Sequence, residues 1–176
     1  MENILSSLIV AIFTSILTVL GTLYVQKRKN KSTIRKNALY LYLNMRQAKA
    51  DIDQDKKAID NNVESEISSM GYFNSFDYIG VLCELKDKLN EQEIIDINNF
   101  YEKIKRLESK KIYYFNMRTL NNNNPSMNPA LPGIYFQQYM ESYAILQNEI
   151  NLLTNSDEYK MNIVEIISKL KKMKNK

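Results

Sequence analysis

The first 25 residues constrain the fold more than any other part of the chain. Residues 4–25 contain no charged side chain, and most of them are large and apolar. A helix of 22 residues is about 33 Å long, whereas the hydrocarbon core of a bilayer is roughly 30 Å thick. The run therefore predicts a transmembrane helix over residues 4–25.

Two other interpretations of this run are a buried core helix and a cleaved signal peptide. A core helix of this length rarely lacks every charge. A signal peptide has a basic start, a shorter apolar stretch and a small-x-small cleavage site. This chain carries Glu2 before the run, and the run ends in Leu23-Tyr24-Val25-Gln26. An uncleaved membrane anchor over residues 1–26 is favoured.

The residues after the run indicate its orientation. Six positive charges lie within residues 27–36, whereas only Glu2 and the terminal amine precede the run. Because cytoplasmic flanks carry the excess of Lys and Arg, we expect a single-pass protein of the inner (plasma) membrane with its N-terminus outside. The C-terminal domain is then cytoplasmic. The single Cys83 suits a reducing compartment.

Small and weakly polar side chains recur along one face of the predicted span. They are Ser7, Ala11, Ser15, Thr18 and Thr22. Such a face lets two helices approach closely in lipid, which predicts self-association of the span and a possible homo-oligomer. Alternatively, the hydroxyls bond back to carbonyls of their own helix. The sequence leaves both interpretations open.

The remainder of the chain predicts an all-α fold. Apolar residues recur at helical spacing over 33–60, 75–89, 91–118, 134–154 and 157–173. All three prolines lie in the predicted loop 121–133. We expect residues 37–176 to form an antiparallel bundle of four or five helices with a basic C-terminal tail.

The first of these helices has a heptad pattern. Its apolar positions, called the heptad row below, are Ile34, Ala38, Leu41, Met45, Ala48, Ile52 and Ile59, with Asp55 interrupting them. No Gly or Pro lies between Gly21 and Gly71, so we expect the span helix to continue into this one. Asn90 with Glu93, and Asn155 with Glu158, have the spacing of capping boxes.

The net charge of +4 conceals a strong asymmetry. The basic juxtamembrane segment 27–36 carries +6 and residues 160–176 carry +5, whereas residues 37–159 have 12 basic and 18 acidic residues. Two basic segments on a membrane protein predict contact with anionic lipid. The candidate residues are Lys27, Arg28, Lys29, Lys31, Lys169, Lys171 and Lys172.

The C-terminal segment 163–176 is a basic amphipathic helix with three interpretations. It is a second contact with the inner leaflet, an ordinary bundle helix with a solvated tail, or a nucleic-acid-binding tail. The bundle helix is favoured. The tail lacks interleaved aromatic residues, so nucleic acid is the least favoured partner.

Catalytic motifs are missing from the sequence. The chain has no His and one Cys, so no Ser-His or Cys-His pair exists. Ser168 and Lys171 match a Ser-x-x-Lys pattern only within a lysine-rich run. Asp51, Asp53 and Asp55 alternate between helix faces, which disfavours a shared metal ion. We expect no enzyme activity and no cofactor.

Tyr135, Tyr139 and Tyr143 stand four residues apart on one predicted helix face. They predict either an aromatic ligand pocket or part of the bundle core, and the core is favoured.

The sequence thus predicts a non-enzymatic, membrane-anchored protein that presents a cytosolic helical bundle to an unidentified protein partner. A bacterial defence or phage-related membrane effector is a narrower form of this expectation. The alternative is a membrane tether for nucleic acid that uses the basic C-terminal tail.

Overall fold

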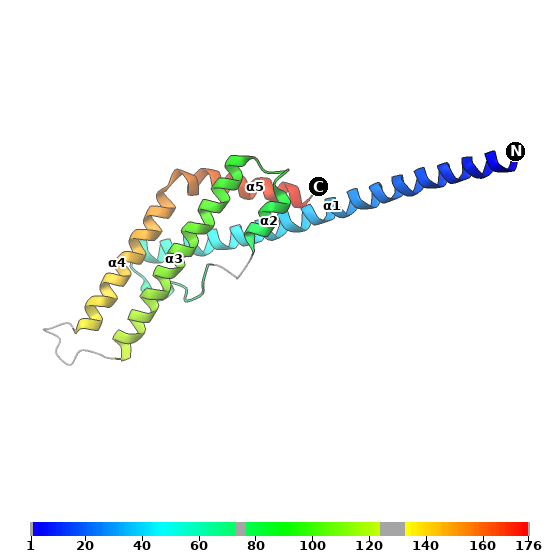
Figure 1. Ribbon diagram of the computed structural model, residues 1–176. Coiled ribbons are helices and arrows are strands. Elements are labelled where there is room, and N and C mark those ends of the chain that lie inside the picture. Colours follow the sequence, from blue (N-terminus) through cyan, green and yellow to red (C-terminus); the bar gives the residue numbers. More distant parts are fainter. Residues whose placement is uncertain (1, 73–76, 124–132, 176) are drawn as a thin grey trace.

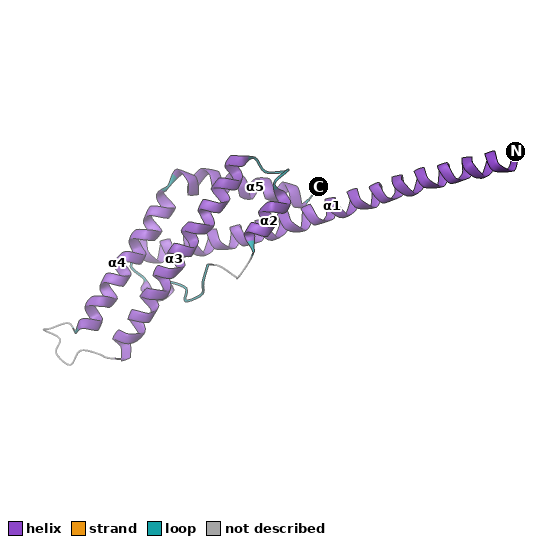
Figure 2. Cartoon of the chain, in the orientation of Figure 1, coloured by secondary structure: helices purple, strands orange, loops and turns teal. Residues whose placement is uncertain are grey.

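The computed structural model describes residues 2–72, 77–123 and 133–175, with side chains from residue 14 onward. The helices are α1 (Glu2–Asp60), α2 (Tyr78–Leu85), α3 (Glu91–Asn123), α4 (Ile134–Asn155) and α5 (Ile163–Lys174). A short 3-10 helix, η1 (Glu64–Glu66), follows α1, and a π turn, η2 (Glu158–Asn162), leads into α5. All these elements are helical (Figure 2), which confirms the all-α prediction.

The longest element is α1, whose 59 residues form one unbroken helix. At 1.5 Å per residue it is about 88 Å long. Residues 14–33, called the projecting segment below, are exposed, and this end of α1 extends away from the other helices (Figure 1). The expected continuation of the N-terminal helix into the 33–60 helix is therefore confirmed.

The second half of α1 lies at the centre of the bundle. In the heptad row, six residues from Ala38 to Ile59 are at most 1% exposed, and Ile34 packs against the edge of the core. Helix α5 lies beside α1, and α3 pairs with α4 in a long hairpin (Figure 1). The predicted heptad pattern is therefore confirmed as a buried stripe.

Some predicted helix boundaries differ from the structure. Helix α2 begins at Tyr78, because the Asp77 side chain accepts a hydrogen bond from the Gly80 N–H (3.0 Å) and caps the helix there. Residues 75–76 of the predicted 75–89 helix lie outside the described residues. Helix α3 continues to Asn123, so the first part of the predicted loop 121–133 is helical. The rest of that loop up to residue 132 is not described, and Gly133 precedes α4.

One predicted capping box is confirmed and the other is wrong. The Glu93 N–H donates to Asn90 Oδ1 (2.8 Å), and the Asn90 N–H donates to Glu93 Oε2 (2.7 Å). Asn155, by contrast, still belongs to α4. The Tyr159 N–H donates to Ser156 Oγ instead (3.3 Å), while the Glu158 carboxylate pairs with Lys103 of α3.

Helix α5 packs as a bundle helix. Ile163, Ile166 and Leu170 are buried against the core, and Met173 is half-buried beside them. The structure thus matches the favoured interpretation of this segment.

Candidate functional site

Residues 14–25 of the projecting segment expose apolar side chains over about two thirds of the helix circumference. Six of them expose more than half of their surface: Ile16, Leu17, Val19, Leu20, Leu23 and Val25. At 100° per residue, Ile16, Leu17 and Val25 point in directions at least 80° apart. Ser15, Thr18 and Thr22 occupy the remaining face. A helix with so wide an exposed apolar surface and no charge needs an apolar environment around it.

The structure describes the side chains of only part of the predicted span, residues 14–25. Where the structure describes side chains, no helix carries an apolar stretch long enough to cross a membrane. Residues 4–13 of the predicted span, with Ser7 and Ala11, lie outside the described side chains.

The described part of the small-residue face is exposed, and the hydroxyls of Thr18 and Thr22 form hydrogen bonds within the helix. Thr18 Oγ1 donates to the Thr14 carbonyl and Thr22 Oγ1 donates to the Thr18 carbonyl, both at 2.8 Å. Ser15 is exposed on the same helix. Around Gly21, which has no neighbour within 4 Å of a Cβ position, Thr18, Thr22 and Val25 line an open groove of about 550 Å³. The threonine hydroxyls thus bond to carbonyls of their own helix, and self-association of the span stays a prediction.

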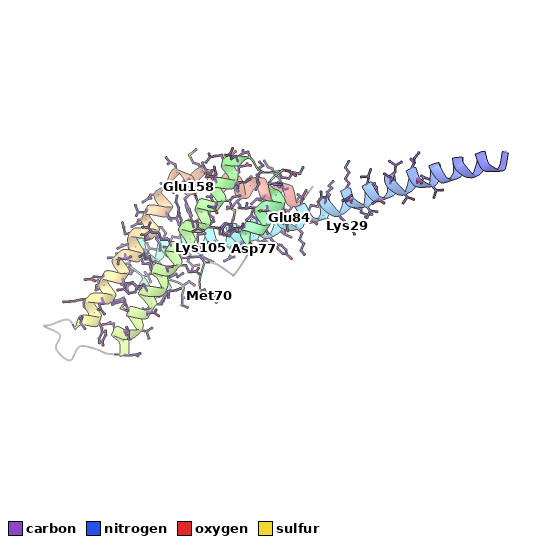
Figure 3. All side chains as sticks on the ribbon, in the orientation of Figure 1. Lys29, Met70, Asp77, Glu84, Lys105 and Glu158 are labelled. Carbon is purple, nitrogen blue, oxygen red and sulfur yellow. The ribbon has the colours of Figure 1, made fainter. Side chains whose placement is uncertain are left out.

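The basic juxtamembrane residues lie directly after the exposed apolar residues. Lys27, Arg28, Lys29 and Lys31 are all exposed. No carboxylate among the described residues pairs with them, and Lys29 lies on the projecting segment, clear of the bundle (Figure 3). Their charges therefore face solvent or a partner outside the chain.

The basic end of α5 lies near the root of the projecting segment. The Tyr159 hydroxyl, before α5, bonds to the Lys49 carbonyl (3.1 Å) and to Asp53 Oδ1 (2.8 Å). At the other end of α5, Lys174 Nζ lies 4.3 Å from the centroid of the Tyr42 ring. Helix α5 is therefore antiparallel to α1, and the C-terminus lies where α1 leaves the bundle (Figure 1). The sequence did not predict this pairing.

The three C-terminal lysines predicted to contact lipid differ in their surroundings. Lys169 forms an ion pair with Glu93 at the start of α3 (2.6 Å). Lys171 and Lys172 are exposed in the last turn of α5, where the helix dipole favours positive charge.

A buried charged cluster fixes α1 to the rest of the bundle. Lys111 Nζ of α3 lies 2.7 Å from Asp55 Oδ2, and both side chains are almost fully buried. Asp55 also accepts hydrogen bonds from the Tyr72 hydroxyl and from the Ser68 N–H (3.0 Å). Burial, together with the negative charge of Asp55, raises the pKa of Tyr72 above its usual value. Asp55, which interrupts the heptad row, therefore connects α1 to α3 and to residues 68–72.

The three clustered aspartates do not share a site. Asp53 pairs with Lys49 (2.8 Å), and Asp51 accepts a hydrogen bond from the Gln47 amide (2.8 Å). Asp55 binds Lys111 as described above. Within the described part of the chain, no three acidic, Cys or His side chains are grouped so that they could hold a metal ion.

The tyrosines of α4 pack mainly into the bundle. The rings of Tyr139 and Tyr143 lie 5.9 and 5.7 Å from the buried ring of Tyr114. The Tyr139 hydroxyl donates to Glu64, and burial raises the pKa of Tyr139. Tyr135 is exposed. This arrangement favours the core interpretation over a ligand pocket.

Comparison with known proteins gives no relatives. No protein-family model matches the chain, and neither a curated protein nor a solved structure is significantly similar to it.

Proposed function

We propose that the chain is a non-enzymatic, single-pass membrane protein that presents its helical bundle to a protein partner at the cytoplasmic face of the inner membrane. One observation carries the proposal. Residues 14–25 of the projecting segment expose apolar side chains over most of the helix and carry no charge, and the basic residues 27–36 follow them directly. Lipid supplies the apolar surroundings that this segment lacks within the bundle.

The helix geometry indicates which basic residues contact lipid headgroups in the proposal. Lys27, Arg28, Lys29 and Lys31 follow Gln26 by one to five residues, which is about 2 to 8 Å along α1. The headgroup region on one side of the bilayer is about 5–8 Å thick, so these four residues lie within it. They are the lipid contacts of the proposal.

The C-terminal lysines lie farther from the bilayer. Lys174 lies over Tyr42, which is 16 residues beyond Gln26, or about 24 Å along α1. At a strong helix tilt of about 40°, this height is still roughly 18 Å. Because charges are screened over about 8 Å at physiological salt, Lys171 and Lys172 add little to lipid binding in the proposal.

A narrower proposal is a bacterial defence or phage-related effector whose spans associate and perturb the bilayer. Only the small-residue face, including Thr18 and Thr22, supports it. Replacing residues 4–25 by leucines should then keep the protein in the membrane and abolish its toxicity on overexpression. No structural observation favours the nucleic-acid alternative.

The single cysteine allows a direct test of the anchor and its orientation. Cys83 is exposed in α2, within the proposed cytoplasmic bundle. In intact cells, a membrane-impermeant maleimide should leave Cys83 unlabelled, and it should label Cys83 after lysis. The protein should also remain in the membrane pellet after an alkaline carbonate wash.

The same experiment contains the contradicting outcomes. Labelling in intact cells would show that the orientation is wrong, and release into the supernatant would show that the chain is not an integral membrane protein. A chain lacking residues 2–25 serves as the control and should appear in the supernatant.

A further inference from the structure

A groove on the bundle surface combines apolar lining residues with two unpaired positive charges. It lies between α1 and α5 and has a volume of about 430 Å³. Ala50 and Val164 lie in its walls together with the half-buried Ile167, and Val164 leaves 47% of its surface exposed. The groove therefore offers apolar surface along one turn of α5, from Val164 to Ile167.

The charges of the groove do not cancel. Lys49 and Asp53 form an ion pair at 2.8 Å, so together they are neutral. Arg46 on α1 and Lys171 on α5 are exposed, and no carboxylate within the described part of the chain pairs with either. Arg46 makes only a long hydrogen bond to the Tyr42 hydroxyl (3.5 Å). Two positive charges thus border an apolar surface.

We propose that this groove binds an acidic amphipathic helix of a partner protein. Helices commonly bind in grooves between two helices through apolar residues spaced three and four apart. Here the apolar side of the bound helix contacts Val164 and Ile167, and its acidic residues lie against Arg46 and Lys171. This inference rests on the proposed function, since it names the chemistry of the partner of the anchored bundle.

The position of the groove excludes lipid as its occupant. Arg46 lies 20 residues beyond Gln26, which is about 30 Å along α1. That distance is several times the screening length of about 8 Å at physiological salt. An anionic bilayer therefore does not reach the groove when residues 4–25 span it.

The groove is also poorly suited to nucleic acid. Proteins that bind single strands stack bases on exposed aromatic rings and contact many phosphates. The only ring in the groove belongs to Tyr42, which is 5% exposed and is covered by Lys174. Two unpaired cations beside apolar lining residues fit acidic residues on an amphipathic peptide better.

A displayed library of random 20-residue peptides can test the proposal. The full chain in detergent micelles is the bait, so the test does not depend on the membrane orientation. We expect the selected peptides to be enriched in Asp and Glu beside apolar residues spaced three and four apart. A double variant, Arg46→Glu with Lys171→Glu, should weaken their binding at least tenfold. The charge-matched control, Lys86→Glu with Lys88→Glu, changes two exposed lysines outside the groove and should leave binding unchanged.

Several outcomes would overturn the proposal. These are a failure to select any peptide, selected peptides without acidic enrichment, and equal binding to the groove variant and the wild type. Binding of a 20-nucleotide single strand that is lost in the groove variant would assign the groove to nucleic acid instead. A failure here leaves the Cys83 labelling result intact, so the groove and the anchor are judged separately.

Discussion

At the scale of single residues, the buried pair of Asp55 and Lys111 is the most demanding feature of the bundle. Two charges removed from water are stable only when each remains paired, and here the pair is completed by the Tyr72 hydroxyl and the Ser68 N–H. The heptad pattern marked Asp55 as an exception but gave no indication of its partner. Lys111 is 56 residues away in the sequence, and nothing in its local pattern distinguishes it from the surface lysines.

We predict that Lys111→Met lowers the free energy of unfolding by about 3–5 kcal/mol, because it leaves Asp55 buried and unpaired. Urea denaturation of the full chain in micelles, followed by near-ultraviolet circular dichroism of the tyrosines, measures the change. The double variant with Asp55→Asn should recover part of the loss. The matched control is Lys105→Met, which removes an exposed ion pair with Glu102 and should change stability little. Equal losses in the two single variants would contradict the prediction.

A second prediction at this scale concerns alkaline pH. Burial raises the pKa of Tyr72, Tyr101 and Tyr159 above the usual value near 10, with nearby acidic groups adding to the effect for the first and third. Above pH 10 the unfolded chain loses these protons while the folded chain keeps them, so stability falls as pH rises. Each tyrosine contributes a loss of about 1.4 kcal/mol per pH unit.

Urea denaturation at several values between pH 9 and 11 measures this slope. Tyr159→Phe should reduce the slope above pH 10 by up to about 1.4 kcal/mol per pH unit, the contribution of one tyrosine. An unchanged slope in that variant would show that Tyr159 does not titrate differently in the folded and unfolded chains.

At the scale of elements, a local signal was reliable only where all the groups that it needs belong to one helix terminus. The Asn90–Glu93 box works as predicted because both groups lie at the start of one helix and need no distant partner. The end of α3 was placed five residues too early, because Asn-rich sequence suggests a loop although the helix continues to Asn123. The second capping box failed because Glu158 binds Lys103 on a different helix.

We predict that Asn90→Ala lowers the free energy of unfolding by about 1 kcal/mol, the usual effect of losing an N-cap side chain. Asn155→Ala is the matched control and should have a smaller effect, because Asn155 lies inside the last turn of α4. Urea denaturation compares the two variants. A larger loss for Asn155→Ala would restore the capping role that the structure gives to Ser156.

At the scale of the whole molecule, the sequence predicted the long N-terminal helix and the all-α bundle but not how the helices pair. The heptad row fixed which side of α1 is buried, because its periodicity is local. The antiparallel pairing of α5 with α1 depends on contacts such as Tyr159 with Asp53, 106 residues apart. The groove between these helices therefore had no signal in the sequence.

We predict that the four lysine and arginine residues after the span set the orientation of the protein. Replacing Lys27, Arg28, Lys29 and Lys31 by Gln leaves only Arg35 and Lys36 in the basic segment. The positive-inside bias then weakens, and part of the protein should insert the opposite way. Impermeant maleimide should label that fraction at Cys83 in intact cells.

A charge-matched control replaces four exposed lysines of the bundle by Gln: Lys57, Lys86, Lys88 and Lys160. This variant should keep Cys83 protected. Full protection in both variants would mean that the basic segment does not determine the orientation.

The unbroken helix α1 has a mechanical consequence. If residues 4–25 span a bilayer, the part of α1 from Gln26 to Asp60 is a rigid arm of about 51 Å, and a tilt of 20° would move its far end sideways by roughly 17 Å. The continuous helix also fixes the direction in which the bundle faces around the axis of α1. Inserting one residue near Ser32 would turn the bundle by about 100° around the helix axis, whereas seven residues would return it to within about 20° of its starting direction. A motion of residues 4–25 would therefore reach the bundle as a rotation or a sideways displacement, because α1 is one continuous helix from Glu2 to Asp60.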